Sequence, residues 1–340
     1  MRGLKVQTFD KEHKISKFVW FVVRILIVVV LIYLIWAQNN LVVSQNFVYT
    51  ASDLPKSFVG FKIMHISDIC NTPHNLYSLA SKEKPDIIII TGGFEDKNGN
   101  YNNSVKVVEK LTTIAPVYYI YNTNDKSDCL SGTSAINITD QKVGISPKQV
   151  DLKTFIINNY GDKLIKDSNK GDEQTIEYLK YVQEELTNTA NSQIYVIGAG
   201  NHEDAEDPKQ FVNDMQYIIG TDSSEVTMLL SGNLYHLKVL SKTDVDMIFT
   251  GGTFGRTDEK NGYSKGLYGK TGAQIFVCGG IGNLEKFRVC NLPQVQIITL
   301  SDGTIRLRNP LEELMDQFMG ETTTIWENDG GLKEKENVMY

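Results

Sequence analysis

The segment Gly200-Asn201-His202-Glu203 contains residue types that commonly bind ions. It follows the apolar run Ile194 to Gly198, so its side chains would stand at the end of a strand. A histidine beside carboxylates can bind Ca²⁺ or another ion. His202, Glu203 and Asp204 are therefore one candidate ion site.

Three glycine pairs also follow apolar runs: Gly92-Gly93, Gly251-Gly252 and Gly279-Gly280. Glycine-rich loops can cradle a phosphate, but the helix context of a P-loop is missing at each of these pairs. We interpret them as tight turns at the rim of a site.

The four cysteines are Cys70, Cys129, Cys278 and Cys290, and they form no C-x-x-C pair. This spacing argues against a zinc knuckle or a thioredoxin-like motif. Cys278 and Cys290 flank a glycine-rich hairpin, where a disulfide is sterically feasible. Four cysteines in 340 residues are not a disulfide framework, and the state of this pair stays open.

The elements that position these residues alternate between strands and helices. Apolar, β-branched runs predict buried strands, and amphipathic stretches between them predict helices. The order β-α-β-α-β with short loops favours parallel strands joined by right-handed crossovers. A strand and turn are expected over Phe47–Gly60. Further strands are expected at Phe61–Asp68, Asp86–Gly93, Val117–Tyr121, Ile194–Gly198, Val226–Leu230 and Met247–Thr250, and helices at Asn75–Lys84, Ser104–Thr113 and Glu173–Leu186.

Two regions have weaker patterns. Residues 126–170 are polar, and we expect a flexible loop or lid there. Residues 274–307 read as an antiparallel set of strands with glycine turns. His65 lies within the first apolar run, and we expect it to be a packed or hydrogen-bonded strand residue.

The order of these motifs resembles the calcineurin-like metallophosphoesterases, in particular their small membrane-anchored bacterial group. The resemblance extends from Asp53 to Leu300. Each motif alone is weak, and their common order and separation carry the resemblance. The motifs are Leu54-Pro55, His65-Ile66-Ser67-Asp68, Pro85-Asp86-Ile87-Ile88, Thr91-Gly92, Pro116-Val117-Tyr118-Tyr119, Leu229-Leu230-Ser231, Val245–Gly251, Gly266-Leu267-Tyr268, Gly282-Asn283 and Pro293–Leu300.

The resemblance implies an α/β fold for residues 61–308, a four-layer sandwich of two mixed sheets flanked by helices. It also implies a centre of two divalent metals, Mn, Fe or Zn, which generate a hydroxide nucleophile and neutralise a phosphoryl oxygen. The family supplies the metal ligands from strand ends, as Asp-x-His, Gly-Asp, Gly-Asn-His, a lone His and Gly-His-x-His.

This chain departs from that pattern at almost every ligand position. Asp68 is retained. Glycine has no side chain to offer a metal, and Phe254 is apolar, so the resemblance implies that the metal centre and its catalytic residues are lost. No cofactor is therefore expected. The degenerate positions are Cys70, Gly93, Asn122-Thr123-Asn124, Gly232, Gly252 and Phe254.

The Gly200-Asn201-His202 segment has the letters of the missing motif but not its place. Asn124 follows the strand that matches the family, whereas His202 lies far downstream of Gly93. Gly198 fits a later strand of the family, which ends in a short acidic loop. We therefore interpret His202, Glu203 and Asp204 as an alternative ion site only.

Residues 18–37 (FVWFVVRILIVVVLIYLIWA) are apolar apart from Arg24. About 20 helical residues cover the roughly 30 Å of hydrocarbon in a bilayer. A cleaved signal peptide usually has a shorter apolar core followed by small residues, whereas this stretch ends in Ile35-Trp36-Ala37. We expect a transmembrane signal anchor, with Arg24 reaching back to the headgroups.

The flanking charges predict the orientation of this anchor. Arg2, Lys5, Lys11, Lys14 and Lys17 precede it, and no Lys or Arg follows until Lys56. Basic flanks stay in the cytoplasm, so residues 1–17 form a cytoplasmic tail of a single-pass cell-membrane protein whose main domain is extracytoplasmic. Residues 38–60 form a linker and lead-in strand.

The overall charge limits the partners. The net charge is −7 and the pI is near 5.4, which argues against broad attraction to nucleic acid. Residues 309–340 form an acidic C-terminal tail. The partners that remain are the membrane, an envelope phospholipid or glycan, or another protein; the oligomeric state is not predicted.

Three functional interpretations follow. We favour a pseudoenzyme that keeps the fold for binding or assembly. The alternative is an active phosphoesterase, acting on a phosphodiester or an envelope phosphate, whose altered or mononuclear site uses Asp68, Cys70, Asn122 or Asn124, with His202 brought in by its loop. A third is a crevice that binds a phosphorylated lipid or glycan without turnover.

Overall fold

A computed structural model provides the fold. It describes residues 5–70, 75–122, 124–147, 173–190, 192–199, 213, 215–218, 220, 225–232, 234, 237–241, 243–253, 262–269, 273–282, 288 and 291–303. Residues 1–305 form one compact unit. The second unit, residues 306–340, lies outside the described residues, as does the predicted acidic tail.

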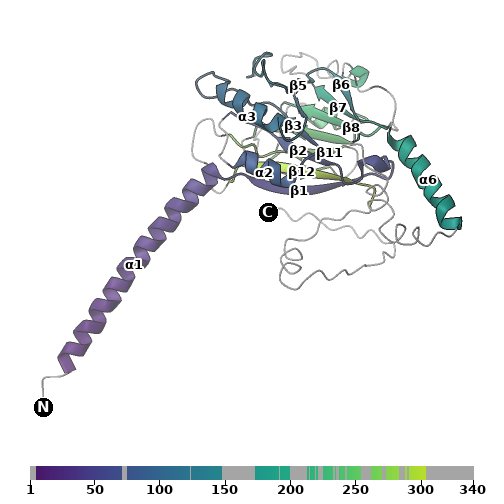
Figure 1. The fold of residues 1–340 in the computed structure, drawn as a ribbon. Helices are drawn as coiled ribbons and strands as arrows, with labels where there is room; N and C mark the ends of the chain where they lie inside the picture. Colours follow the sequence, from purple (N-terminus) through teal and green to yellow (C-terminus); the bar gives the residue numbers. More distant parts are fainter. Residues whose placement is uncertain are drawn as a thin grey trace. The chain divides into compact units, whose positions relative to one another are not determined.

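The fold is mixed α/β, and the described residues form two six-stranded sheets (Figure 1). In the first sheet, β2 to β5 run parallel, β12 is antiparallel to β2, and β1 is parallel to β12. Its order is β1 (Val43–Thr50), β12 (Gln294–Ser301), β2 (Lys62–Ile66), β3 (Ile87–Ile90), β4 (Val117–Tyr119) and β5 (Ile136–Asn137).

The second sheet has a parallel centre and antiparallel edges. Strands β11, β9, β8 and β7 run parallel, and β10 and β6 pair antiparallel at the two ends. Its order is β10 (Gly266–Tyr268), β11 (Gln274–Val277), β9 (Met247–Thr250), β8 (Thr227–Ser231), β7 (Ile194–Ala199) and β6 (Lys142–Ile145).

The helices connect these strands. Helix α2 ends where Lys84 takes a left-handed conformation, and Pro85 follows it; proline cannot continue a helix. The described helical elements are α1 (Lys5–Asn40), η1 (Lys56–Phe58), α2 (Leu76–Glu83), α3 (Asn102–Thr112), α6 (Glu173–Ala190) and α8 (Leu237–Leu240).

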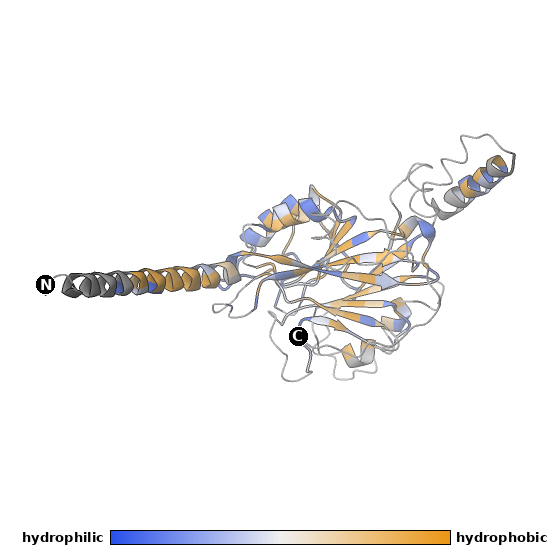
Figure 2. Ribbon diagram, turned by 90° about the horizontal axis from the view of Figure 1, so that it is seen from below, coloured by the Kyte–Doolittle hydropathy of each residue, from blue (hydrophilic) through white to orange (hydrophobic). Residues whose placement is uncertain are grey.

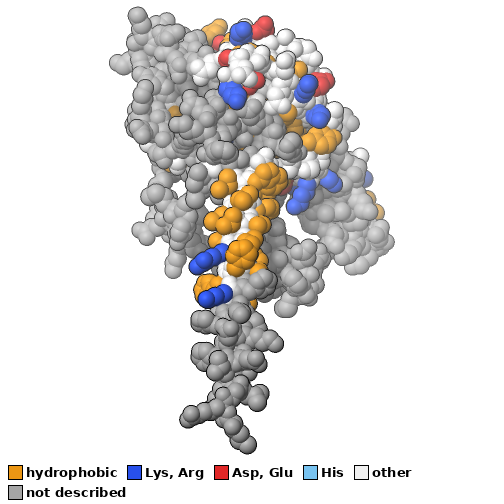
Figure 3. Space-filling view, turned by 90° about the vertical axis from the view of Figure 1, so that its left-hand side faces the viewer, with side chains coloured by type: hydrophobic (Ala, Val, Ile, Leu, Met, Phe, Trp, Pro, Cys, Tyr) orange, Lys and Arg blue, Asp and Glu red, His pale blue; other side chains and the backbone are white. Residues whose placement is uncertain are grey.

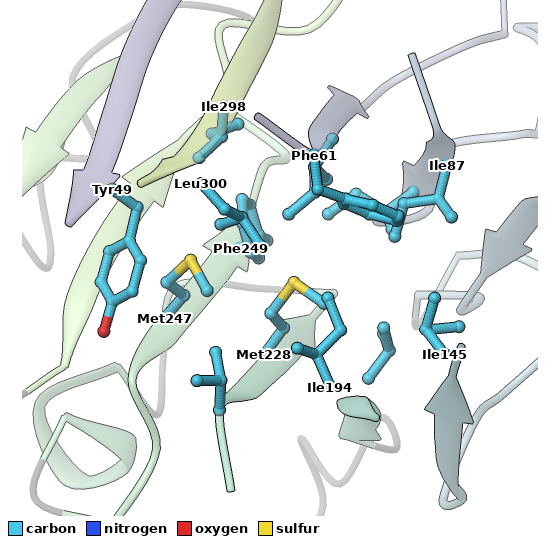
Figure 4. Packing of buried hydrophobic residues seen from close by; sticks show 14 of the residues in the cluster. Tyr49, Phe61, Ile87, Ile145, Ile194, Met228, Met247, Phe249, Ile298 and Leu300 are labelled. Atoms are coloured by element: carbon cyan, nitrogen blue, oxygen red, sulfur yellow. The ribbon is translucent and has the colours of Figure 1, made fainter. Parts of the chain in front are cut away.

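The core follows the alternation of side chains along each strand. In β3, Ile87 and Ile89 face the second sheet, where they join one cluster with Met228 and Phe249. Figure 4 shows this packing between the sheets, and Figure 2 shows the apolar colouring of the strands that supply it. A strand buried on both faces needs apolar residues at every position, and this explains the unbroken run of isoleucines in β3.

The outer faces of both sheets carry apolar side chains that pack on helices. Ile88 and Ile90 join a cluster with Ala80 of α2 and with Val108 and Leu111 of α3. On the second sheet, Ile197, Leu229 and Ile248 share a cluster with Leu237 and Leu240 of α8.

Much of the predicted framework is confirmed. The β2-α2-β3-α3-β4 half forms with parallel strands, and the strands predicted near residues 194, 226 and 247 are β7, β8 and β9. The lead-in strand begins at Val43 instead of Phe47.

Two predictions are wrong. Residues 274–307 do not form an antiparallel set, because β11 and β12 belong to different sheets and β11 runs parallel to β9. Residues 126–170 are not simply a loop, because this region contains β5 and β6, which occupy an edge of each sheet. Residues 148–172 lie outside the described residues.

Helix α1 is long and apolar enough to cross a membrane, over Val19–Ala37. From Val19 to Trp36 every side chain is exposed, and Ala37 is buried; the helix is therefore not packed into the core. Figure 3 shows its apolar side chains, with basic side chains near the N-terminal end of the stretch.

Candidate functional site

Asp68 lies just beyond the carboxyl end of β2, where the resemblance places the retained metal ligand. It is 1% exposed, and its φ of 53° is left-handed, a conformation that aspartate tolerates better than most residues. The Asp68 N–H donates to the Gly92 carbonyl, and the Cys70 N–H donates to the Gly93 carbonyl at 3.0 Å each. The turn after β2 is therefore pinned to the turn after β3.

Two glycines enclose Asp68. A Cβ added at Gly93 would lie 2.6 Å from the Asp68 Cα and 2.7 Å from Oδ1. A Cβ added at Gly280 would lie 2.3 Å from Oδ2. Both glycines also have positive φ, 80° and 67°. The position where the family carries its second Asp therefore has no room for a side chain unless the backbone moves.

The backbone after β11 closes over the same aspartate. The Gly282 N–H donates to the Asp68 carbonyl, and the Ser67 hydroxyl donates to Asp68 Oδ2 at 3.3 Å. The buried Arg288 guanidinium holds this segment in place, donating to the carbonyls of Gly279 at 3.2 Å and Gly282 at 2.6 Å. Asp68 is thus enclosed by loops from both sheets.

Asn122 occupies the carboxyl end of β4 and uses its amide locally. Its Oδ1 accepts the N–H groups of Asn124 at 3.0 Å and Asp125 at 3.2 Å, the pattern of an asparagine turn. Added Cβ atoms at Gly92 and Gly232 would lie 2.9 and 3.1 Å from its Cβ. Thr123 lies outside the described residues.

Asp125 is a residue of this site that sequence reasoning missed. Its carboxylate accepts four backbone N–H groups: those of Gly93 and Phe94 at 2.8 Å each, and those of Glu95 and Asn122 at 3.1 Å each. Burial raises the pKa of Asp125, and the four N–H donors oppose that shift. The signal available in the sequence was an aspartate directly after the Asn122 turn. The sequence does not show its main partners, because those N–H groups lie in the loop after β3.

The second sheet contributes backbone to this region. Gly251, after β9, lies so close to Ser67 that an added Cβ would be 2.2 Å from the Ser67 Cβ. An added Cβ at Gly252 would lie 3.8 Å from the Gly232 carbonyl oxygen. The loops after β2, β8 and β9 therefore meet at one edge of the two sheets. Phe254 lies outside the described residues.

The described cysteines, Cys70, Cys129 and Cys278, are buried and none of them is in a disulfide. Burial raises the pKa of Cys278 to about 11 and that of Cys129 to about 12, so both are thiols at neutral pH and not the thiolates that bind metals. Because Cys278 is free, the disulfide with Cys290 that the sequence left open is not formed; Cys290 itself lies outside the described residues.

His65 is a hydrogen-bonded strand residue, as predicted. Its Nδ1 lies 2.9 Å from Gln296 Oε1, and its Nε2 lies 3.1 Å from Thr91 Oγ1. Burial lowers its pKa to about 4, so the ring is neutral at pH 7. Gln296 donates onward to the Val277 carbonyl at 3.0 Å, and this chain of contacts joins the two sheets.

A two-metal centre does not fit the described residues. Within them, no group of three or more His, Cys, Asp or Glu side chains is arranged to hold a metal ion. Gly93 and Gly280, which have no side chains, lie next to Asp68. The Asn122 amide oxygen already accepts two N–H groups. The candidate ion ligands His202, Glu203 and Asp204 lie outside the described residues.

Comparisons with known proteins add little. No protein-family model matches the chain, and no curated protein matches it. Among solved structures, a dimetal phosphatase from Danio rerio is similar at 9% sequence identity and a TM-score of 0.31, over 66% of this chain and 88% of that one. A similarity at this TM-score assigns neither a family nor a chemistry.

Proposed function

We propose that this protein is a membrane-anchored, extracytoplasmic pseudoenzyme with a metallophosphoesterase-like domain, which serves in binding or assembly. The observation that carries the proposal is the enclosure of Asp68 by Gly93 and Gly280. Backbone fills the space on both sides of this carboxylate, where a dimetal enzyme needs further ligands and a bridging hydroxide.

The strand-end motifs support the metallophosphoesterase-like fold. Asp68, Gly93 and Asn122 follow β2, β3 and β4, and Gly232 and Gly252 follow β8 and β9. Carboxyl ends of parallel strands are where α/β folds place their ligand sites. With helices packed on the outer faces of two stacked sheets, the four-layer sandwich is the arrangement that we propose.

The loss of activity is proposed from what replaces the ligands. Neighbouring side chains can replace a single lost metal ligand, but the glycines at positions 93, 232 and 252 have no side chain that could bind a metal. The Asn122 amide oxygen already accepts two N–H groups of its own turn. We expect the enclosed edge to serve as a rigid scaffold.

The orientation is proposed from the flanks of α1. Basic residues cluster before the apolar stretch and are absent from residues 38–55, so the positive-inside rule places the sheets outside the cytoplasm. Protease added to intact cells should digest the domain and spare an N-terminal tag. Protection of the domain until the cells are opened would reverse the orientation.

Metal binding is the direct test of the proposal. The detergent-purified full-length protein is incubated with Mn²⁺, Fe²⁺ or Zn²⁺, desalted, and analysed for bound metal by elemental analysis. We expect no stoichiometric pair of ions. Two ions per chain that are lost in Asp68→Ala would overturn the proposal. One ion lost in His202→Ala, and kept in Asp68→Ala, would instead identify the acidic loop as an ion site.

Turnover tests the active alternative separately. We expect no release of nitrophenol from bis(nitrophenyl) phosphate in the presence of these metals. Release that disappears in Asp68→Ala, but persists in the matched surface variant Asp96→Ala, would make the protein a working phosphoesterase. The surface variant guards against a contaminating hydrolase, whose activity would survive both substitutions.

A further inference from the structure

Lys17 and Arg24 share one face of α1. They are seven residues apart, which on a helix is about two turns, or roughly 10.5 Å along the axis. Trp20 lies three residues after Lys17 and four before Arg24, so it belongs to the same face. All three side chains are exposed, and Figure 3 shows basic side chains projecting on one side of the helix at this end.

The direction of helical side chains carries the Arg24 charge out of the apolar stretch, toward the N-terminal interface. Every Cα–Cβ bond in a helix tilts toward the N-terminus. Arg24, which starts inside the apolar stretch Val19–Ala37, therefore reaches back toward the level of Lys17. The cost of a charge in hydrocarbon favours the same direction. Both cations are thus placed in the headgroup layer, on the same side of the helix.

Aromatic side chains fix the depth of this face. Tyr33 and Trp36 form a ring pair at the other end of the stretch, with centroids 6.1 Å apart. Tryptophan and tyrosine favour the two interfaces of a bilayer. Trp20 and Trp36 are separated by about 24 Å along a helix, close to the hydrocarbon thickness of roughly 30 Å. With Trp36 at one interface, Trp20 lies at the other.

We propose that Lys17, Trp20 and Arg24 form a site for the headgroup of an anionic phospholipid, in the leaflet at the N-terminal end of α1. This inference rests on the proposed role of α1 as a membrane anchor. A guanidinium can hold two phosphate oxygens at once, and the ammonium of Lys17 supplies a second charge. The indole supplies an apolar surface for the glycerol and upper acyl carbons.

A lipid fits this face better than a second transmembrane helix. Helices associate in membranes through small residues that allow close approach. Residues 18–37 contain no Gly, Ser or Thr, and their one Ala is the last residue, Ala37. Bulky Val, Ile and Leu side chains fill the rest of the stretch, and acyl chains can conform to such a surface.

Lipid retention is the test. Full-length protein is extracted from bilayers that hold equal phosphatidylcholine and phosphatidylglycerol, and the lipids that stay bound are counted by native mass spectrometry. We expect phosphatidylglycerol to be enriched, and the enrichment to fall about fivefold for each of Lys17→Gln and Arg24→Gln. The control Lys82→Gln/Lys97→Gln removes two positive charges, one more than either single variant, from exposed positions outside α1 and should keep the enrichment.

Two results would overturn the inference. The first is equal retention of phosphatidylcholine and phosphatidylglycerol by the unaltered protein, or the same phosphatidylglycerol enrichment in the unaltered protein and in all variants. Either outcome leaves the anchor proposal intact. The second is release of the unaltered protein by alkaline carbonate, which shows that α1 does not span the bilayer and removes the lipid site with it. Carbonate extraction is therefore performed on the same preparations.

Discussion

Gly93 shows how one position can decide whether a metal centre is feasible. Its φ of 80° disfavours a side chain, and its contact with Asp68 leaves no room for one. A matched position exists in Gly132, which has a similar φ of 85° but nothing within 4 Å of an added Cβ. The pair separates the cost of backbone conformation from the cost of crowding.

We expect Gly93→Ala to lower the free energy of unfolding more than Gly132→Ala does. A positive φ costs an alanine roughly 1–2 kcal/mol at either position. Overpacking adds roughly 1–3 kcal/mol at Gly93 alone. Urea denaturation of the two variants measures the difference. Equal losses would show that the contact with Asp68 relaxes freely, and that a ligand at position 93 is sterically acceptable.

His65 makes stability depend on pH. Burial lowers its pKa from 6.5 to about 4. Above pH 6.5 the ring is neutral in both states and stability is complete. As the pH falls from about 6.5 to about 4, only the unfolded chain takes up the proton, so the free energy of unfolding decreases, by on the order of 3 kcal/mol in all.

His65→Leu isolates this contribution. The variant loses the contacts to Gln296 and Thr91, so it is less stable at pH 7, but the His65-dependent decrease between pH 6.5 and pH 4 should disappear. Other groups titrate equally in both proteins, so the difference between the two urea-denaturation series reports His65. Parallel curves over this range would contradict a neutral, buried ring.

At the scale of elements, Asp125 connects the loop after β3 to the loop after β4. One carboxylate accepts N–H groups from both loops. An asparagine at this position has one oxygen, and its amide nitrogen would face N–H donors that need an acceptor. Removing acceptors from buried donors costs roughly 1–3 kcal/mol per group.

We therefore expect Asp125→Asn to destabilise the protein by about 3 kcal/mol. The control is Asp96→Asn, since Asp96 also accepts two backbone N–H groups, those of Asn98 and Asn100, but in an exposed turn. It should cost under about 1 kcal/mol. Hydrogen exchange of the Phe94 and Glu95 amides reports the local effect, and unchanged exchange in Asp125→Asn would contradict the role of the carboxylate.

Sequence patterns predict some elements of this fold and not others. The isoleucine run of β3 and the amphipathic helices beside it define the parallel half without ambiguity. Strands β5 and β6 lie in polar surroundings and are short, so they form only because a neighbouring strand offers its edge. Strands β11 and β12 flank a glycine turn as a hairpin would, and their separation into two sheets depends on distant partners.

The sequence likewise predicts some features of the candidate site and not others. The residue types at positions 68, 93 and 122 are visible in the sequence, so the retained Asp68 and the loss of the expected ligands at positions 93 and 122 can be read directly. The enclosure of Asp68 cannot be read from the sequence, because Gly280 comes from the other end of the domain, in a segment that Arg288 holds in place. Asp125 was missed because three of its four donors lie in a loop that precedes it by about one βα unit.

At the scale of the whole domain, Phe249 joins the two sheets. It stacks on Phe276 at 5.0 Å between ring centroids and meets the His65 ring edge-on at 5.2 Å. His65 belongs to the first sheet, and both phenylalanines belong to the second. The same ring therefore contributes to packing within one sheet and across the interface between them.

We expect Phe249→Ala to cost roughly 3–5 kcal/mol, the range for removing a buried aromatic ring. Tyr217→Ala removes a ring that is 90% exposed and should change stability by about 0.5 kcal/mol or less. Thermal unfolding compares the two. A small effect at Phe249 would mean that the sheets are held together mainly by other contacts.

The place of β12 between β1 and β2 also sets the order of events during synthesis. Strand β1 leaves the ribosome directly after the anchor, whereas its neighbour β12 is made roughly 250 residues later, which at 5–20 residues per second is about 12–50 s. Throughout that interval β1 has no strand to pair with on the side that β12 will occupy. A nascent chain that stops before Gln294 therefore cannot close this sheet, however complete the rest of it is.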